Sequence, residues 1–191
     1  MKHHAFVAGL ALLCAGTVVP ASWAAAPTPP QKYDAQYARD RAEIEDLQAR
    51  YLFALDWQDA DAYADTFTVD GVLDWTGGII RGREAIRTEV GKMRASFAKH
   101  EAADAPLRPS RLRHLTSASV IRVDGDRATS IVEWFEIDND SRTRWPHVTG
   151  YGHFEDELRR VDGKWLIASH KIYNEALEKR AAGPKNPAPP P

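Results

Sequence analysis

The stretch Tyr51–Trp75, YLFALDWQDADAYADTFTVDGVLDW, limits the possible folds of this chain more than any other segment. Its pattern indicates the end of an apolar helix, an acidic break, a short second helix and an Asp-Gly step into a strand. Two carboxylates, Asp56 and Asp59, lie among aromatic residues in this stretch. Carboxylates in such surroundings can have raised pKa values and can serve in acid–base chemistry.

Helical spacing dominates the first half of the chain. Apolar residues in the first helix recur at intervals of three and four, and Asp59 or Asp61 caps the second helix. A turn at Val69–Gly71 leads into a short strand, and Gly77 and Gly78 break or bend it. The elements predicted here are the helices Tyr33–Gln58, Ala60–Phe67 and Arg83–Lys99 and the strand Val72–Trp75.

The pattern changes to extended segments after residue 109. Asp-Gly-Asp at 124–126 and Asp-Gly at 162–163 are hairpin turns between β-branched and aromatic runs. The strands predicted in this half are His114–Val123, Arg127–Ile137, Trp145–Arg160 and Trp165–Tyr173. Helices followed by an antiparallel meander predict an α+β fold, in which three helices against a strongly bent sheet enclose a conical cavity.

The chain is expected to be exported, to the periplasm or outside the cell. Residues 1–24 form a signal peptide, with a weakly basic start, an apolar run and small residues before the cleavage site. The single cysteine, Cys14, lies inside this segment, and Leu13 before it argues against a lipid anchor. A Pro-rich leader covers residues 25–37, one domain covers 38–176, and a Pro-rich tail at 177–191 is expected to be disordered.

The charge pattern gives little support to nucleic-acid binding. The formal net charge is −2 for the full chain, and basic residues do not alternate with aromatic residues in one patch. Without a cysteine, the mature chain has no disulfide and no thiol nucleophile.

The order of these motifs resembles the SnoaL-like group of the nuclear transport factor 2 (NTF2)-like superfamily. The motifs are ALDWQDADAYADTFTVDGVLDW, RGREAIR, RHLTSASVIRVDGDRAT and GYGHFEDELRRVDGKWLI, in that order, over about residues 38–174. Relatives in the superfamily include scytalone dehydratase, ketosteroid isomerase and limonene epoxide hydrolase. The resemblance implies an NTF2-like cone and a homodimer, and this fold hosts enzymes and non-enzymes alike.

The resemblance to scytalone dehydratase suggests an Asp–His pair. Asp59 matches the aspartate near the end of the first helix, and His114 in LRHLTSA matches the histidine that opens a strand. Trp75 falls where the dehydratase has a tyrosine that polarises the substrate. The second histidine of that enzyme has no clear counterpart, and the matching region lies near Ile137 and Asp138.

Each candidate residue also has a structural interpretation. Asp59 fits a helix cap as well as a pocket role, and His114 fits a hydrogen-bonded position at the rim as well as a pocket role. Asp56 lies away from the apolar stripe of its helix and faces either the cavity or the solvent. If it is buried without a cation, its pKa should rise.

Four aromatic residues are candidates for the lining of a substrate pocket, although core packing is the stronger interpretation for any single one of them. They are Tyr51, Trp75, Trp134 and Phe154. Alternation in RATSIVEWFEI places Val132, Trp134 and Glu136 on one strand face, but it does not decide which face is inside. The spacing of the histidines at 147, 153 and 170 is not a recognised metal-ligand pattern, and we predict no metal site.

Two functions remain open from the sequence. One is a cofactor-independent dehydratase, isomerase or hydrolase in which His114, oriented by Asp59, moves a proton while Asp56 or Tyr51 assists. Its substrate would be a small, mostly apolar, oxygenated molecule. The other is a non-catalytic module that binds a small ligand or a protein partner.

Overall fold

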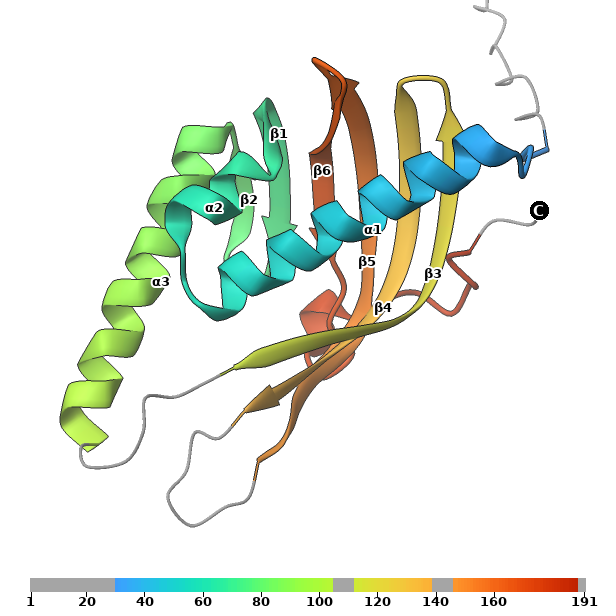
Figure 1. Cartoon of the computed structure of the whole chain (residues 1–191). Coiled ribbons are helices and arrows are strands. Elements are labelled where there is room, and N and C mark those ends of the chain that lie inside the picture. The colour runs from blue at the N-terminus through green and yellow to red at the C-terminus, as the bar shows by residue number, and fades with distance from the viewer. Residues whose placement is uncertain (1–29, 105–111, 139–145, 189–191) are drawn as a thin grey trace, which may run out of the picture.

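The computed structural model describes residues 30–104, 112–138 and 146–188, and it shows three helices packed on a curled, mixed sheet of six strands (Figure 1). The sequence-based α+β cone is therefore confirmed. The predicted signal peptide, Cys14 included, lies outside the described residues, as do residues 25–29 of the Pro-rich leader. None of the described helices is both long enough and apolar enough to cross a membrane.

Helix α1 spans Ala35–Asp56 and begins at Asp34, whose side chain accepts hydrogen bonds from the backbone N–H groups of Gln36 and Tyr37, each at 3.0 Å. The predicted stripe is buried at Ile44, Leu47, Tyr51 and Ala54, because this side of α1 lies against the sheet (Figure 1). The other helices are α2, Ala60–Asp65, and α3, Arg83–Asp104.

The six strands lie in the order β2-β1-β6-β5-β4-β3. They are β1 Phe67–Trp75, β2 Gly78–Arg81, β3 Arg113–Asp124, β4 Arg127–Asp138, β5 His147–Val161 and β6 Lys164–Ile172. All neighbouring strands are antiparallel except β1 and β6, which are parallel. The predicted antiparallel sheet is thus correct for β3–β6 and wrong at this one junction.

Strand β1 starts five residues earlier than the sequence pattern predicts. Asp70 and Gly71, expected in a turn, lie within the strand, and the pairing of β1 with β6 shifts register between Phe67 and Val72. An irregularity in a strand accommodates residues that otherwise favour turns. The actual turn, at Thr76 and Gly77, joins β1 to β2 as an antiparallel hairpin.

The inner face of the sheet is the one that carries Val132 and Trp134. Both side chains are buried, together with Phe154 of β5, in the core that α1 covers. Trp134 pairs with Gly152, and Glu136 pairs with Gly150, so alternation keeps all three predicted residues of β4 on the inner face. This settles the question that the sequence left open.

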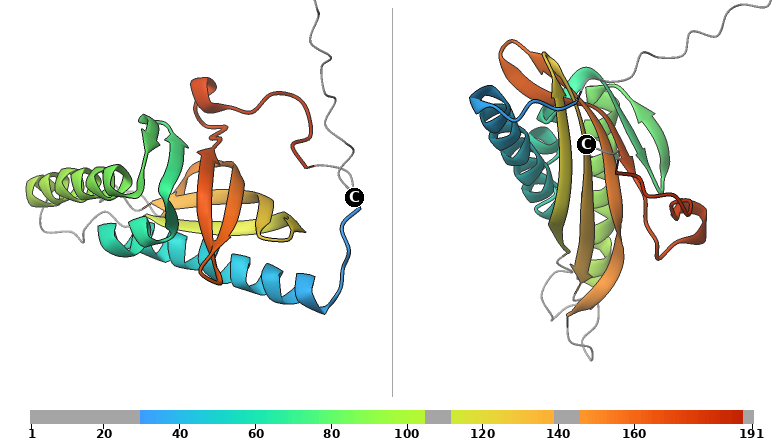
Figure 2. Two further views of the ribbon diagram at one scale, coloured as in Figure 1. Left: turned by 90° about the horizontal axis from the view of Figure 1, so that it is seen from above. Right: turned by 90° about the vertical axis from the view of Figure 1, so that its right-hand side faces the viewer.

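The segment after β6 differs from the expected disordered tail. Glu178–Arg180 forms a short 3₁₀ helix, η1, on the opposite side of the sheet from α1 (Figure 2). Arg180 makes an ion pair with Asp74 at 2.8 Å and also donates to the backbone carbonyl oxygen of Ile172. These contacts fasten the segment to the ends of β1 and β6.

Candidate active site

His114 lies between two carboxylates where α1 ends and β3 begins. Its Nδ1 is 2.7 Å from Oδ1 of Asp56, and its backbone N–H donates to Oδ2 of the same carboxylate at 3.0 Å. Its Nε2 is 3.1 Å from Oε2 of Glu136. The side chains of His114 and Asp56 are 10% and 5% exposed, and that of Glu136 is 22% exposed. Glu136 is therefore the member of this group most open to an incoming molecule.

The partner of His114 is Asp56, so the predicted Asp59–His114 pair is corrected. Helix α1 ends at Asp56, and Gln58 then adopts a left-handed backbone conformation with φ of 56°. The reversal places Asp59 at the start of α2, where its carboxylate accepts from the backbone N–H of Ala62 at 3.0 Å. Asp59 is thus a helix cap, which was the structural interpretation of this residue in the sequence analysis.

Asp56 is the last residue of α1. The C-terminal end of a helix carries a partial negative charge, which disfavours a carboxylate unless a cation lies beside it. A protonated His114 supplies that cation. The carboxylate of Asp56 is therefore stabilised by His114 of β3, and the residue pattern of the helix alone does not show this contact.

Sequence reasoning placed Glu136 on the same strand face as Trp134 but did not include it in the site. Glu136 is the direct cross-strand neighbour of His114, and neighbours on one sheet face have side chains within contact distance. The register of β4 and β5 shifts between Glu136 and Ile137, and beside this shift the hydroxyl of Thr149 donates to the Glu136 carboxylate. The alternation of β4 placed Glu136 on the same face as Trp134, but only the pairing register of β3 with β4 shows that Glu136 lies beside His114.

The two carboxylates change the protonation of His114. Burial alone would lower the pKa of His114, but the hydrogen bonds and charges of Asp56 and Glu136 outweigh it and raise the pKa to about 9. Burial would raise the pKa of Glu136, whereas the contacts with His114 and Thr149 lower it overall. At neutral pH the site therefore contains an imidazolium flanked by carboxylates.

The raised pKa predicts a dependence of stability on pH. His114 binds its proton more tightly in the folded chain than in the unfolded chain, where its pKa is near 6.5. Its contribution, roughly 3 kcal/mol, is thus fully present below about pH 6.5 and lost as the pH rises to about 9. Urea unfolding from pH 6 to 9.5 should show this fall, and His114→Gln should remove it. An equal fall in the variant would assign it to other groups.

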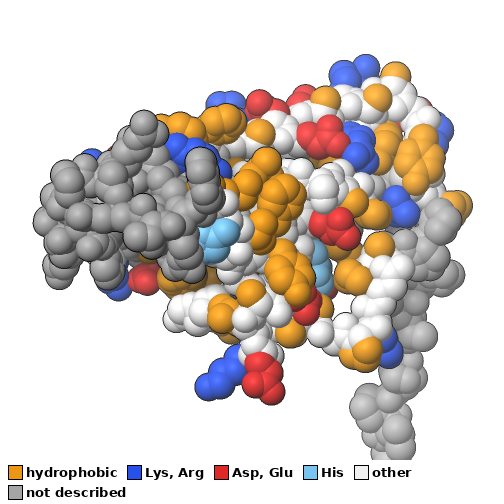
Figure 3. Space-filling model, turned by 90° about the horizontal axis from the view of Figure 1, so that it is seen from below, with side chains coloured by type: hydrophobic (Ala, Val, Ile, Leu, Met, Phe, Trp, Pro, Cys, Tyr) orange, Lys and Arg blue, Asp and Glu red, His pale blue; other side chains and the backbone are white. Residues whose placement is uncertain are grey.

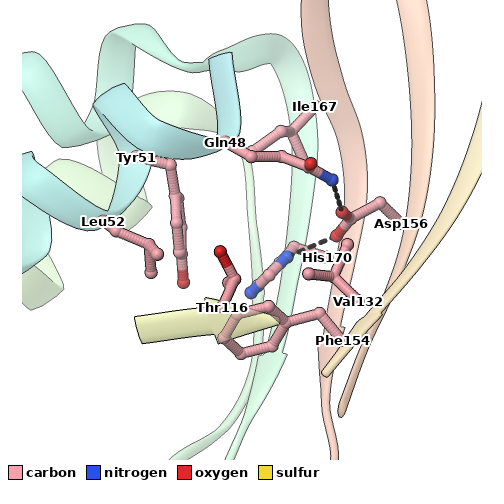
Figure 4. Close-up of a pocket in the computed structure, with 9 residues that line it drawn as sticks. All are labelled: Gln48, Tyr51, Leu52, Thr116, Val132, Phe154, Asp156, Ile167 and His170. Carbon is pink, nitrogen blue, oxygen red and sulfur yellow. Dashed lines mark hydrogen bonds and ion pairs between the residues drawn. The ribbon is translucent and has the colours of Figure 1, made fainter. Parts of the chain in front are cut away.

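A pocket lies between α1 and the inner face of the sheet (Figure 4). Its cavity volume is about 10 Å³, which is the room that one water molecule needs, so a larger ligand requires lining side chains to move. The lining residues are Gln48, Tyr51, Leu52, Thr116, Val132, Phe154, Asp156, Ile167 and His170.

The structure brings together three of the four predicted lining aromatics. Tyr51 and Phe154 line the pocket. Trp134 stacks on Phe154 with 5.4 Å between the ring centroids, and the ring centroid of Trp134 is 5.9 Å from that of His114. Trp134 thus connects His114 to the pocket wall. Trp75 is not among the lining residues, because its ring lies over the turn at Gly77, where an added Cβ would come within 2.4 Å of it.

Sequence reasoning missed the polar residues at the inner end of the pocket. Asp156 lies two residues after Phe154 on the same face of β5, and it pairs across the sheet with His170, which had been weighed only as a metal ligand. Within the described ranges, no group of three or more histidine, cysteine, aspartate or glutamate side chains is placed to hold a metal ion.

Comparison with known proteins assigns the family. The model of the SnoaL-like domain matches residues 36–171. The chain belongs to the SnoaL-like domain family. This is a family of small-molecule-binding or catalytic proteins, and the chain has the NTF2-like fold. Among curated proteins, none matches this sequence.

Several solved bacterial proteins share this fold. A variant of Rv3472 from Mycobacterium tuberculosis, described as a protein of unknown function, is 30% identical, with 75% of this chain and 76% of that chain covered and a TM-score of 0.59. A Catenulispora acidiphila protein in complex with S-DNPA is 27% identical, with 72% and 95% covered and a TM-score of 0.59. ActVI-ORFA from Streptomyces coelicolor, at 20% identity, 73% and 98% coverage and a TM-score of 0.62, shares the fold.

Proposed function

We propose that this SnoaL-like protein is an acid–base enzyme of the dehydratase, isomerase or hydrolase kind. The supporting observation is the imidazole of His114, held between Asp56 and Glu136 beside an aromatic pocket. The substrate is a small, mostly apolar molecule that carries oxygen. The side chains present are sufficient for proton transfer without a cofactor.

The protonation states divide the work between the two residues that face the substrate. His114 is the proton donor at neutral pH because its pKa is about 9, and Glu136 is the proton acceptor because its pKa is lowered. Asp56 keeps its contact with Nδ1 and so orients the ring, which leaves Nε2 for the substrate oxygen. The substrate oxygen would share or replace the contact between Nε2 and Glu136.

A β-hydroxy ketone illustrates the chemistry. The Glu136 carboxylate takes the proton from the carbon next to the carbonyl group, and Nε2 of His114 gives its proton to the hydroxyl that leaves as water. A C–H bond and a C–O bond break, a C=C bond forms, and water leaves with the proton from His114. Glu136 then passes its new proton to Nε2 of His114, 3.1 Å away, which restores both groups. An isomerase would use the pair to move a proton between two carbons.

The test is a substrate screen with a matched pair of variants. The mature chain, residues 25–191, is assayed with hydroxy-ketones, enones and epoxides, and Glu136→Gln is expected to lower the rate about 10²- to 10⁴-fold. Glu133→Gln is the control, since Glu133 lies on the same strand but is exposed and contacts Ser117. Equal rates for both variants and the unmodified protein would refute the proposed role of Glu136.

The alternative function is a non-catalytic module that binds a small ligand. One observation favours it: carboxylates occupy both ring nitrogens of His114, as in a purely structural ion-pair network. In that case ligands would bind without turnover, and Glu136→Gln would change stability but no rate.

We also propose export and a homodimer. Residues 1–24 support export by their composition alone. A dimer is supported by exposed side chains on the outer face, where Leu115, Phe135 and Tyr151 form one row across β3, β4 and β5, with Leu115 and Tyr151 exposed. Hydrophobic side chains also gather on the face seen from below (Figure 3). Sedimentation of the mature chain, with Tyr151→Lys as the disrupting variant, tests this association.

A further inference from the structure

A side-chain amide lies at the far end of the row of residues that begins at His114. His114, Glu136 and Gly150 are direct neighbours across β3, β4 and β5, so their side-chain positions lie on one face of the sheet. A Cβ atom added at Gly150 would lie 3.3 Å from Nδ2 of Asn174, which belongs to the segment after β6. The row therefore runs from an imidazole through a carboxylate and a glycine to an amide.

The segment after β6 brings Asn174 to this place. The backbone N–H groups of Tyr173 and Glu175 donate to carbonyl oxygens of β5 at 2.9 Å and 2.8 Å. The chain thus continues along β5 beyond the end of β6, on the side away from β4. Nε1 of Trp134 donates to the carbonyl oxygen of Tyr173 at 3.1 Å and so ties the same segment to β4.

The orientation of the Asn174 amide is fixed by its own loop. Oδ1 accepts from the backbone N–H of Ala176 at 2.9 Å, so the hydrogen-bond pattern assigns the other position to Nδ2. The backbone N–H of Asn174 donates to the carbonyl oxygen of Arg180, whose side chain is anchored on Asp74. Among the residues that the structure describes, none accepts a hydrogen bond from Nδ2. This half-buried amide therefore presents N–H donors that a ligand can use.

Two glycines of β5 make the close approach of this segment possible. A Cβ atom at Gly152 would come within 2.2 Å of the carbonyl oxygen of Tyr173, so any other residue there would push the segment away. A Cβ atom at Gly150 would lie 3.2 Å from the ring of Trp134 and 3.3 Å from Nδ2 of Asn174. Gly150 thus keeps the row free of a side chain between Glu136 and the amide.

We infer that Asn174 is a further catalytic residue, whose Nδ2 donates a hydrogen bond to the carbonyl oxygen of a β-hydroxy carbonyl substrate. The inference rests on the proposed acid–base function and names its substrate class. The order of groups in such a molecule, hydroxyl, acidic C–H and carbonyl, matches the order of His114, Glu136 and Asn174 along the row. When Glu136 takes the proton from carbon, the electron pair moves to the carbonyl oxygen, and Nδ2 stabilises this enolate. The pair then returns to form the C=C bond as the hydroxyl, protonated by His114, leaves as water.

The first test measures the dehydration of diacetone alcohol, a small β-hydroxy ketone, to mesityl oxide. Asn174→Asp keeps the acceptor for Ala176 but removes the donor, and it should lower kcat/KM about 10²- to 10³-fold. Asn174→Ala removes the donor without adding a charge and should give a loss of the same order. Asn186→Asp is the matched control, because Asn186 is exposed and its Oδ1 accepts from the backbone N–H of Ala188 in the same way, at 3.0 Å. This control should keep the full rate.

The second test uses the unmodified mature chain and needs no turnover. Diacetone alcohol should move the side-chain amide resonances of Asn174 in ¹H–¹⁵N NMR spectra. Tert-butanol, which has the tertiary hydroxyl but no carbonyl group, should leave these resonances in place. The side-chain amide of Asn186 is the internal reference and should respond to neither molecule.

The outcomes separate this inference from the proposed function. Turnover that Asn174→Asp and Asn174→Ala both leave unchanged would overturn the role of Asn174, while loss of turnover in Glu136→Gln would still support the acid–base proposal. Movement of the Asn174 resonances without any turnover would support carbonyl binding at Asn174 and count against the enzyme. If diacetone alcohol did not move these resonances even at high millimolar concentration, the inference would be wrong.

Discussion

Replacing Asp56 with asparagine is expected to lower the pKa of His114 from about 9 by about one to three units. The substitution removes a negative charge 2.7 Å from Nδ1 but keeps the shape of the side chain. At pH 7 a larger share of His114 would then be neutral and unable to donate a proton, so turnover of any substrate found should fall by up to about tenfold. NMR titration of the His114 ring measures the pKa directly.

Asp59 offers the matched control, three residues further along the chain. Asp59→Asn keeps an equally good helix cap, so stability and the pKa of His114 should both stay close to those of the unmodified protein. Asp59→Ala should cost about 1 kcal/mol of stability through loss of the cap and still leave this pKa unchanged. If Asp59→Asn lowered the pKa as much as Asp56→Asn, the pairing derived from the sequence would be restored.

The largest effect on stability is expected at Phe67. Its side chain is fully buried, and its ring lies 6.1 Å from that of Tyr51 and 5.6 Å from that of Tyr63 between centroids. Phe67→Ala should lower the free energy of unfolding by about 3–5 kcal/mol, because it removes a large apolar group and leaves a cavity. Urea denaturation followed by circular dichroism measures the change.

Val69, two residues along the same strand, is the control for Phe67. Its side chain is 77% exposed, so Val69→Ala should change stability by no more than about 0.5 kcal/mol. A loss below about 1 kcal/mol in Phe67→Ala would mean that the core closes around the missing ring. Phe67 also lies beside His170, at 6.5 Å between ring centroids, so the variant opens space next to the inner end of the pocket.

The elements that sequence patterns predicted well are those whose signals are local. The hairpins at 124–126 and 162–163 depend on a few adjacent residues, and the buried stripe of α1 depends on spacing within one helix. The parallel pairing of β1 with β6 depends on a contact between segments about a hundred residues apart. Nothing in either strand alone indicates that partner.

The same distinction explains the site residues. His114 was identified by its motif, but the choice between Asp56 and Asp59 depends on the backbone reversal at Gln58, where a left-handed conformation is uncommon for a residue other than glycine. Glu136 lay on a strand whose inner face could be decided only after α1 was seen against it. Tertiary packing thus selected Asp56 over Asp59 and added Glu136 to the site.

The two Asp–His groups, at His114 and at His170, also determine which charges a ligand can carry into the interior. Asp56, Glu136 and Asp156 supply three carboxylates, which lie against the imidazoles of His114 and His170. A carboxylate or phosphate ester entering this interior would therefore meet repulsion as well as the cost of losing its hydration. The pocket should select neutral molecules and reject anions of the same shape, for example phenol over benzoate.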